Sequence, residues 1–138
     1  MLAYVDSSVI LRLVLGERNG LAEWSKIEVG VTSALTEVEC LRTLDRMRLG
    51  QRLGPEGLAE RRAAVFTTLQ RLEVMPLSPA VLSRAANPMP SPLGTLDALH
   101  LSSAMLRRDA SRVPITMATH DEALALAARA SGLAVVGV

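Results

Sequence analysis

Apolar residues along this chain form short runs and longer periodic segments, and the two patterns alternate. Short apolar runs bounded by turn-forming residues predict strands. These strands are expected at residues 2–5, 29–32, 73–77, 113–119 and 133–138. Longer segments with apolar residues at helical spacing predict helices between them. These helices are expected at residues 7–17, 20–28, 33–49, 55–72, 79–86, 95–108 and 121–131.

Capping and turn-forming residues mark the ends of several predicted helices. Ser33 is a preferred N-cap residue, and Gly50 is a stop signal for the helix that Ser33 begins. Pro55 and Pro79 stand in the first turn of their helices, where proline is tolerated. Gly132 ends the last predicted helix.

The alternation of strands and helices predicts an α/β fold with three layers. We expect a central, mainly parallel twisted sheet with helices on both faces. The segment 87–94, with three prolines and a glycine, has the composition of a loop. The pieces on either side of it are too small to fold alone. We therefore predict a single domain over residues 1–138.

The composition mainly excludes other classes of protein. A hydrophobic content of 49% excludes a disordered chain, and a net charge of +1 says nothing about partners. Cys40 is the only cysteine, so no intramolecular disulfide can form, which is consistent with a reducing cytoplasm. No apolar run is long enough to span a bilayer, and Asp6 and Arg12 interrupt the only candidate signal segment. We expect a soluble cytoplasmic protein.

Candidate chemistry begins with acids that follow strands. Asp6 ends the first predicted strand, and Asp121 follows a later one. In parallel α/β folds, ligands bind outside the carboxyl ends of the strands. Asp97 lies in the first turn of its helix among apolar neighbours, so it is expected to be partly buried, and burial without a partner is costly. A metal ion would supply that partner.

The helix 33–49 offers a further acid, Glu39. At 3.6 residues per turn, Glu39 shares a narrow face with Arg42 and Arg46, whereas Glu37 lies almost opposite. Arg42 is expected either to orient Glu39 or to touch an anionic substrate. The same helix has a second apolar stripe, which predicts packing on two sides, in the core or against a second subunit.

Each acid alone also has a structural explanation. Asp6 could be a helix cap, Asp97 is favoured by the helix dipole, and Glu39 could form a surface ion pair. Four converging acids without a cation would repel one another and raise their own pKa values. A hard divalent cation removes that conflict, and Mg²⁺ fits best because it accepts a few carboxylates and keeps its waters.

Four segments of the chain resemble the PIN-domain ribonucleases, specifically the VapC-type toxins of toxin–antitoxin pairs. The resemblance rests on "YVDSSVIL", "TSALTEVECLRTL", "LGTLDALHLSSA" and "MATHDEALALAARASGLAVV", in that order. It implies a magnesium-dependent endoribonuclease, in which Mn²⁺ substitutes for Mg²⁺, with an acidic site. It also implies a small antitoxin whose tail occupies a hydrophobic groove, and a homodimer.

The same resemblance assigns roles to individual positions. It implies that Asp6, Glu39, Asp97 and Asp121 hold the metal and carry out catalysis, Glu39 either through water or by deprotonating the nucleophile. It implies that Ser8 and Thr119 support the acids, with Arg42 beside Glu39. His100 is expected to be a packed, hydrogen-bonded histidine, and His120 receives no role.

RNA carries negative charge, so an acidic pocket needs a basic rim. Arg42 and Arg46 are the expected RNA-binding residues, within a run that also contains other arginines. The alternative for this run is a solvated helical surface. With 2% aromatics, extensive base stacking is not expected.

Two other classes of protein share some of these features. A PIN-like module could act only by holding a partner, without nuclease activity. A phosphoaspartyl-type phosphatase would require a second Asp two residues after the first, and Ser8 occupies that position. The complete set of four acids favours the nuclease.

Overall fold

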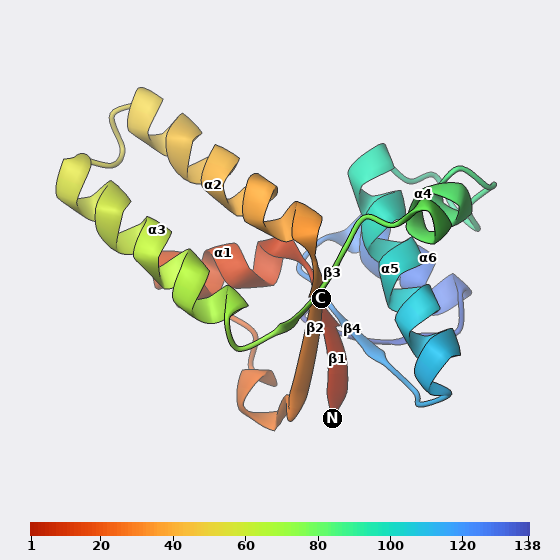
Figure 1. The fold of residues 1–138 in the computed structure, drawn as a ribbon. Coiled ribbons are helices and arrows are strands. Elements are labelled where there is room, and N and C mark those ends of the chain that lie inside the picture. The colour runs from red at the N-terminus through yellow and green to blue at the C-terminus, as the bar shows by residue number, and fades with distance from the viewer.

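The computed structural model describes all 138 residues and contains alternating strands and helices (Figure 1). The strands are β1 (Leu2–Val5), β2 (Val29–Ser33), β3 (Glu73–Met75), β4 (Thr116–Ala118) and β5 (Ala134–Val136). The helices are α1 (Ser7–Leu15), α2 (Ala34–Leu49), α3 (Pro55–Leu69), α4 (Pro79–Ala85), α5 (Thr95–Ser111) and α6 (Glu122–Ala130). No helix has both the length and the apolar character needed to cross a membrane.

The five strands form one sheet in the order β3-β2-β1-β4-β5, and every neighbouring pair is parallel. From β1, the chain builds one side of the sheet through β2 and β3 and later the other side through β4 and β5. The chain therefore reverses direction across the sheet between β1 and β4. In open parallel sheets, ligands bind at such a switch point, outside the carboxyl ends of the strands.

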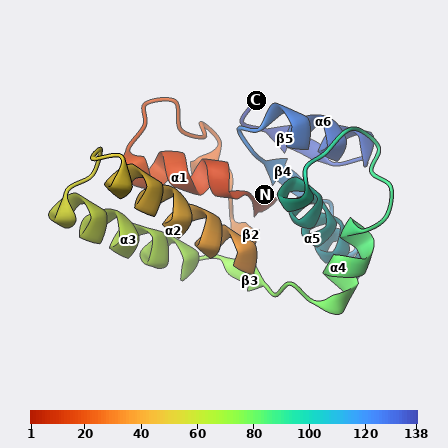
Figure 2. The same cartoon turned by 90° about the horizontal axis from the view of Figure 1, so that it is seen from above.

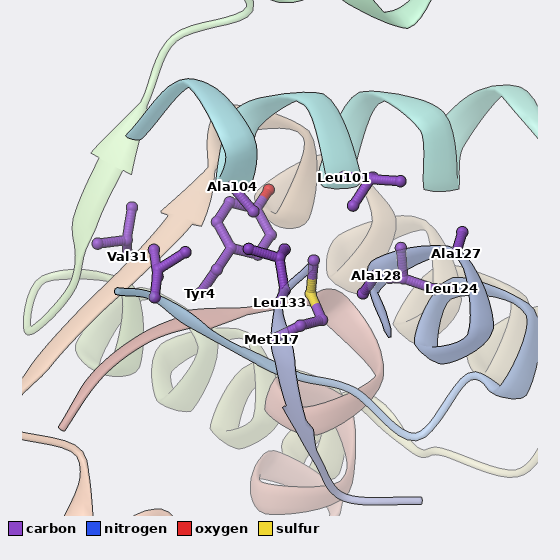
Figure 3. Packing of buried hydrophobic residues seen from close by; sticks show 10 residues of the cluster. Tyr4, Val31, Leu101, Ala104, Met117, Leu124, Ala127, Ala128 and Leu133 are labelled. Atoms are coloured by element: carbon purple, nitrogen blue, oxygen red, sulfur yellow. The ribbon is translucent and has the colours of Figure 1, made fainter. Parts of the chain in front are cut away.

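Helices cover both faces of the sheet, which confirms the predicted three-layer α/β/α fold. Helices α1, α2 and α3 lie together on one face, and α4, α5 and α6 lie on the other (Figures 1 and 2). Each face has its own core of ten buried residues. Tyr4, Met117 and Leu101 meet in one of them (Figure 3), and Val5, Ile10 and Leu44 meet in the other.

Local capping explains why the helices begin at these residues. Ser33 caps α2 by accepting a hydrogen bond from the Leu35 amide, and Ser78 caps α4 in the same way from Val81. Pro55 and Pro79 each occupy the first turn of a helix. The N-cap predicted at Ser33 and the first-turn prolines predicted at Pro55 and Pro79 are confirmed.

The predicted helix over residues 20–28 is wrong. This segment contains only a single 3-10 turn, η1 (Trp24–Lys26), and no side chain caps it. Its apolar residues Leu21, Trp24 and Ile27 pack on the core beneath α1 from an irregular loop. The predicted strands over 73–77, 113–119 and 133–138 are correct in place but longer than the three-residue strands observed.

Candidate active site

Asp6 lies at the carboxyl end of the central strand and caps α1. Its carboxylate accepts hydrogen bonds from Ser8 Oγ at 2.7 Å, Thr119 Oγ1 at 2.9 Å and the Val9 amide at 3.4 Å. Only 3% of the residue is exposed. Burial raises the pKa of Asp6, and the hydrogen bonds from Ser8 and Thr119 act against that rise. Asp6 is thus a helix N-cap that also stands at a strand end. The two alternatives from the sequence, a cap and a site residue, therefore do not exclude each other.

The turn after β4 is tied to the turn after β1. The buried Thr119 hydroxyl donates to Asp6 Oδ2 and accepts from the Asp121 amide at 2.9 Å. The His120 amide donates to Ser8 Oγ at 2.9 Å. Asp121 caps α6 by accepting from the Leu124 amide at 2.8 Å. Ser8 and Thr119 thus contact the acids as the resemblance implied, and they hold Asp6 and Asp121 at one edge of the sheet.

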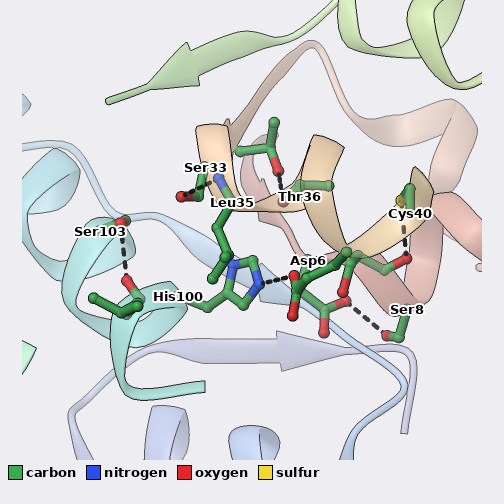
Figure 4. A network of polar contacts seen from close by, with 12 residues as sticks. Asp6, Ser8, Ser33, Leu35, Thr36, Cys40, His100 and Ser103 are labelled. Carbon is green, nitrogen blue, oxygen red and sulfur yellow. Dashed lines mark hydrogen bonds and ion pairs between the residues drawn. The ribbon is translucent and has the colours of Figure 1, made fainter. Parts of the chain in front are cut away.

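Glu39 reaches the same region from α2. Its Oε2 lies 2.7 Å from Nε2 of His100, and its side chain is 18% exposed. His100 comes from α5, on the opposite layer, and lies beside Asp6 in the polar network of Figure 4. Glu37 is exposed on the other side of α2, as the helical spacing predicted. His100 is the packed, hydrogen-bonded histidine that was expected.

Asp97 differs from the other three acids because no hydrogen bond holds its carboxylate. It lies half-buried in the first turn of α5, after Gly94. Burial raises the pKa of Asp97, and the negative charges of Asp121, Asp6 and Glu39 raise it further. Asp97 therefore lies near enough to each of the other three acids for their negative charges to disfavour its ionisation.

The donors present suit a hydrated cation. No three His, Cys, Asp or Glu side chains lie close enough together to coordinate one ion directly. Proteins usually bind Mg²⁺ through one or two carboxylates, and water fills the remaining positions. Asp97, whose carboxylate has no hydrogen bond, fits that chemistry as one such ligand.

The expectation that Arg42 orients Glu39 is not supported by any contact. Arg42 donates to Asp45 at 2.9 Å, one turn further along α2, and Arg46 donates to Thr43 at 2.8 Å. Both guanidinium groups are exposed and line a groove of about 300 Å³ that Glu39 also lines. The alternative role for Arg42, contact with an anionic substrate, remains a prediction.

Sequence reasoning did not find the partner of Glu39. His100 and Glu39 are 61 positions apart, and nothing local links them. The available signal was that His100 follows Asp97 by one helical turn, which places both on a similar face of α5.

His120 is fixed by the C-terminal segment. Its Nδ1 lies 2.6 Å from the Gly137 carbonyl oxygen, which can only accept, so Nδ1 carries the proton. Gly137 has φ +104°, and a Cβ there would overlap the carbonyl oxygen of Thr119. The chain after β5 thus passes directly behind the turn that supports Asp6.

We expect Gly137→Ala to destabilise the protein by about 2–4 kcal/mol, because backbone strain at positive φ adds to an overlap with the main chain. Urea denaturation of the variant and the wild type measures this loss. Gly20→Ala is the control, since its Cβ would make only an ordinary contact with Glu17 at 3.6 Å. Equal stability of the two variants would contradict the close approach at Gly137.

Together these features define a three-layer α/β/α protein in which Asp6 and Asp121 follow the carboxyl ends of β1 and β4, at the switch point of its sheet. Residues 3–130 match the PIN domain, and the chain belongs to this family. None of the curated proteins matches the sequence.

Solved structures share the fold. A toxin–antitoxin complex from Klebsiella pneumoniae contains a chain that is similar with a TM-score of 0.66 and 17% identity, over 89% of this chain and 90% of that one. The Pyrobaculum aerophilum protein PAE2754 is similar with a TM-score of 0.59 and 19% identity, over 97% of this chain and 83% of its own.

Proposed function

We propose that this chain is a magnesium-dependent endoribonuclease that acts as the toxin of a toxin–antitoxin pair. The observation that carries the proposal is Asp97, a half-buried carboxylate without a hydrogen bond whose pKa is raised by its burial and by three neighbouring acids. A cation beside such a group would stabilise its charged form. Membership of the PIN domain family supports the same conclusion.

Asp6, Asp97 and Asp121 are the residues proposed to hold the metal, directly or through water. Bound Mg²⁺, or Mn²⁺ in its place, would supply water of lowered pKa and positive charge at the scissile phosphate. Ser8 and Thr119 keep Asp6 in place through their hydrogen bonds. Glu39, whose second oxygen is not bonded to His100, takes the proton of the attacking water or contacts the ion through water.

RNA is proposed to approach along the groove beside α2. Arg42 and Arg46 line this groove together with Glu39, so phosphates bound there would lie next to that acid. Binding through a few phosphate contacts makes affinity fall steeply with salt. Only one Trp, one Tyr and one Phe occur in the chain, which leaves little scope for base stacking.

An antitoxin is the proposed protein partner, as in the structurally similar toxin–antitoxin complex. A groove of about 580 Å³ between α4 and α5 is lined mainly by apolar residues, among them Ala98, which follows Asp97 in the sequence. An apolar antitoxin tail is proposed to lie there. We also propose a homodimer in the cytoplasm. Helix α2 does not offer two free apolar sides, because Cys40, Leu44 and Met47 all pack inward on α1 and α3.

Magnesium dependence is the central test of this function. Purified protein is expected to cut cellular RNA in Mg²⁺, to stop completely in EDTA, and to recover when Mg²⁺ or Mn²⁺ is added in excess of the chelator. Cleavage is followed by gel electrophoresis of the RNA. Activity that persists in chelator would refute the metal mechanism.

Mapping of RNA ends in cells identifies the substrate. Wild type and Asp97→Asn are expressed briefly, and the 5′ and 3′ ends of total RNA are sequenced. Cuts that only the wild type makes would identify the RNA class and the cleavage sequence. Identical patterns would remove the nuclease assignment and favour a PIN-like module that acts only by binding.

A further inference from the structure

A buried histidine connects the two helical layers at the site. His100, on α5, is 1% exposed and bonds two groups at once. Its Nδ1 lies 2.9 Å from the Tyr4 hydroxyl on β1, and its Nε2 lies 2.7 Å from Glu39 Oε2 on α2. Tyr4 is also buried and meets the imidazole edge to face, with ring centroids 5.9 Å apart.

The chemistry of the two partners sets the direction of both hydrogen bonds. A carboxylate oxygen accepts, so Nε2 of His100 carries a proton and donates it to Glu39. Burial raises the pKa of Tyr4 well above its usual range, so the phenol keeps its proton and can donate it to Nδ1. That direction of the bond favours the imidazole tautomer that presents N–H to Glu39.

We propose that His100, oriented by Tyr4, is a positioning residue for Glu39 in the proposed nuclease reaction. By binding Oε2, His100 would leave Oε1 free for the ion or the attacking water. Glu39 is the only one of the four acids whose carboxylate is bonded by a side chain from a helix of the opposite layer. Asp6 and Asp121 are fixed by backbone amides of the helices they cap.

This inference rests on the proposed function for its catalytic consequence, but the hydrogen bonds can be tested without it. Nitrogen-15 NMR of labelled wild-type protein reports which ring nitrogen of His100 is protonated. A proton on Nε2 with a bare Nδ1 supports the arrangement. A proton on Nδ1 with a bare Nε2 overturns it, whether or not the protein cuts RNA.

Two substitutions separate the two hydrogen bonds of His100. The amide of Gln reaches the position of Nε2, so His100→Gln keeps a donor for Glu39. The amide of Asn reaches only the position of Nδ1, so His100→Asn keeps a partner for Tyr4 and leaves Glu39 unheld. Both variants replace the buried imidazole by an amide, so their effects on core packing should be similar.

We expect His100→Asn to lose about 10–100-fold in Mg²⁺ affinity or kcat, the usual range for groups that orient metal ligands, with KM for RNA unchanged. His100→Gln should restore most of that loss. In the Glu39→Gln background, His100→Asn should cause no further loss, because its effect acts through Glu39. Calorimetry measures Mg²⁺ binding, and single-turnover cleavage measures the rate.

Each alternative result has a definite meaning. Equal loss in His100→Gln and His100→Asn, or an additive loss in the double variant, would show that His100 serves only the core and would overturn the proposal. If His100→Asn fails to fold, the Gln variant and the NMR result still decide the question. Wild-type protein without any cleavage would overturn the proposed function instead, and Mg²⁺ binding by the variants would still test the positioning.

Discussion

Asp97→Asn is expected to lose more than about 100-fold in RNA cleavage, beyond the range for groups that merely orient a ligand. It is also expected to make the metal-free protein more stable. The charged carboxylate is half-buried, lacks a hydrogen bond and lies near Asp121, Asp6 and Glu39. Its replacement by a neutral amide of equal size removes that repulsion together with a ligand for the cation.

The gain in stability should depend on pH in a defined direction. Because burial and neighbouring acids raise the pKa of Asp97, the folded protein binds this proton more tightly than the unfolded chain does. Wild-type stability is therefore reduced as pH rises from the usual carboxyl pKa through the raised one. Asp97→Asn should exceed the wild type above that window and equal it below.

Chemical denaturation in EDTA measures the stability gained when the charge repulsion at Asp97 is removed. Denaturation in Mg²⁺ measures the stability lost with the cation ligand. At 100 times its Kd, Mg²⁺ should raise the unfolding free energy of the wild type by about 2.7 kcal/mol, and that of Asp97→Asn by much less. Glu122→Gln is a matched control, since Glu122 is exposed in the first turn of α6. Wild-type activity in Asp97→Asn would remove Asp97 from the site.

Glu39→Gln is expected to reduce cleavage by about 10²–10⁴-fold, the range for loss of a general base. Glutamine keeps the size of the side chain and an oxygen for His100, so the fold should be retained. Single-turnover rates at saturating RNA measure the effect on the chemical step.

Glu37→Gln provides the matched control on the same helix. Glu37 is two positions away and exposed on the other side of α2, so its cleavage rate should equal that of the wild type. A larger loss in Glu37→Gln than in Glu39→Gln would show that the wrong glutamate was assigned to the site.

The sequence predicted the elements whose ends are encoded locally. Ser33 and Pro55 specify helix starts through contacts within a few residues, so they could be recognised without any tertiary information. The alternation of strands and helices, which is also visible in local sequence patterns, predicted the parallel sheet. The helix predicted around Trp24 was wrong because the apolar residues of this segment fill the core from a loop. Apolar spacing alone does not distinguish such a loop from a helix.

The sequence indicated candidate site residues but not the contacts that they make. Strand ends identify Asp6 and Asp121, because the carboxyl edge of a parallel sheet is a general binding position. The pairing of Glu39 with His100, and of Arg42 with Asp45, depends on how α2 meets α5 and on rotamer choice. Neither pairing is encoded in local spacing. For this reason the spacing on α2 predicted that Arg42 orients Glu39, whereas Arg42 contacts Asp45.

Strand β1 is the first element of the chain, yet one of its neighbours in the sheet is β4, more than a hundred residues later. During synthesis, the N-terminal half therefore leaves the ribosome before Thr119 and Asp121 exist to complete the site. Contacts between such distant segments form late. The proposed nuclease activity should therefore be absent from the growing polypeptide until β4 and the turn that carries Thr119 and Asp121 have been made and have joined the sheet.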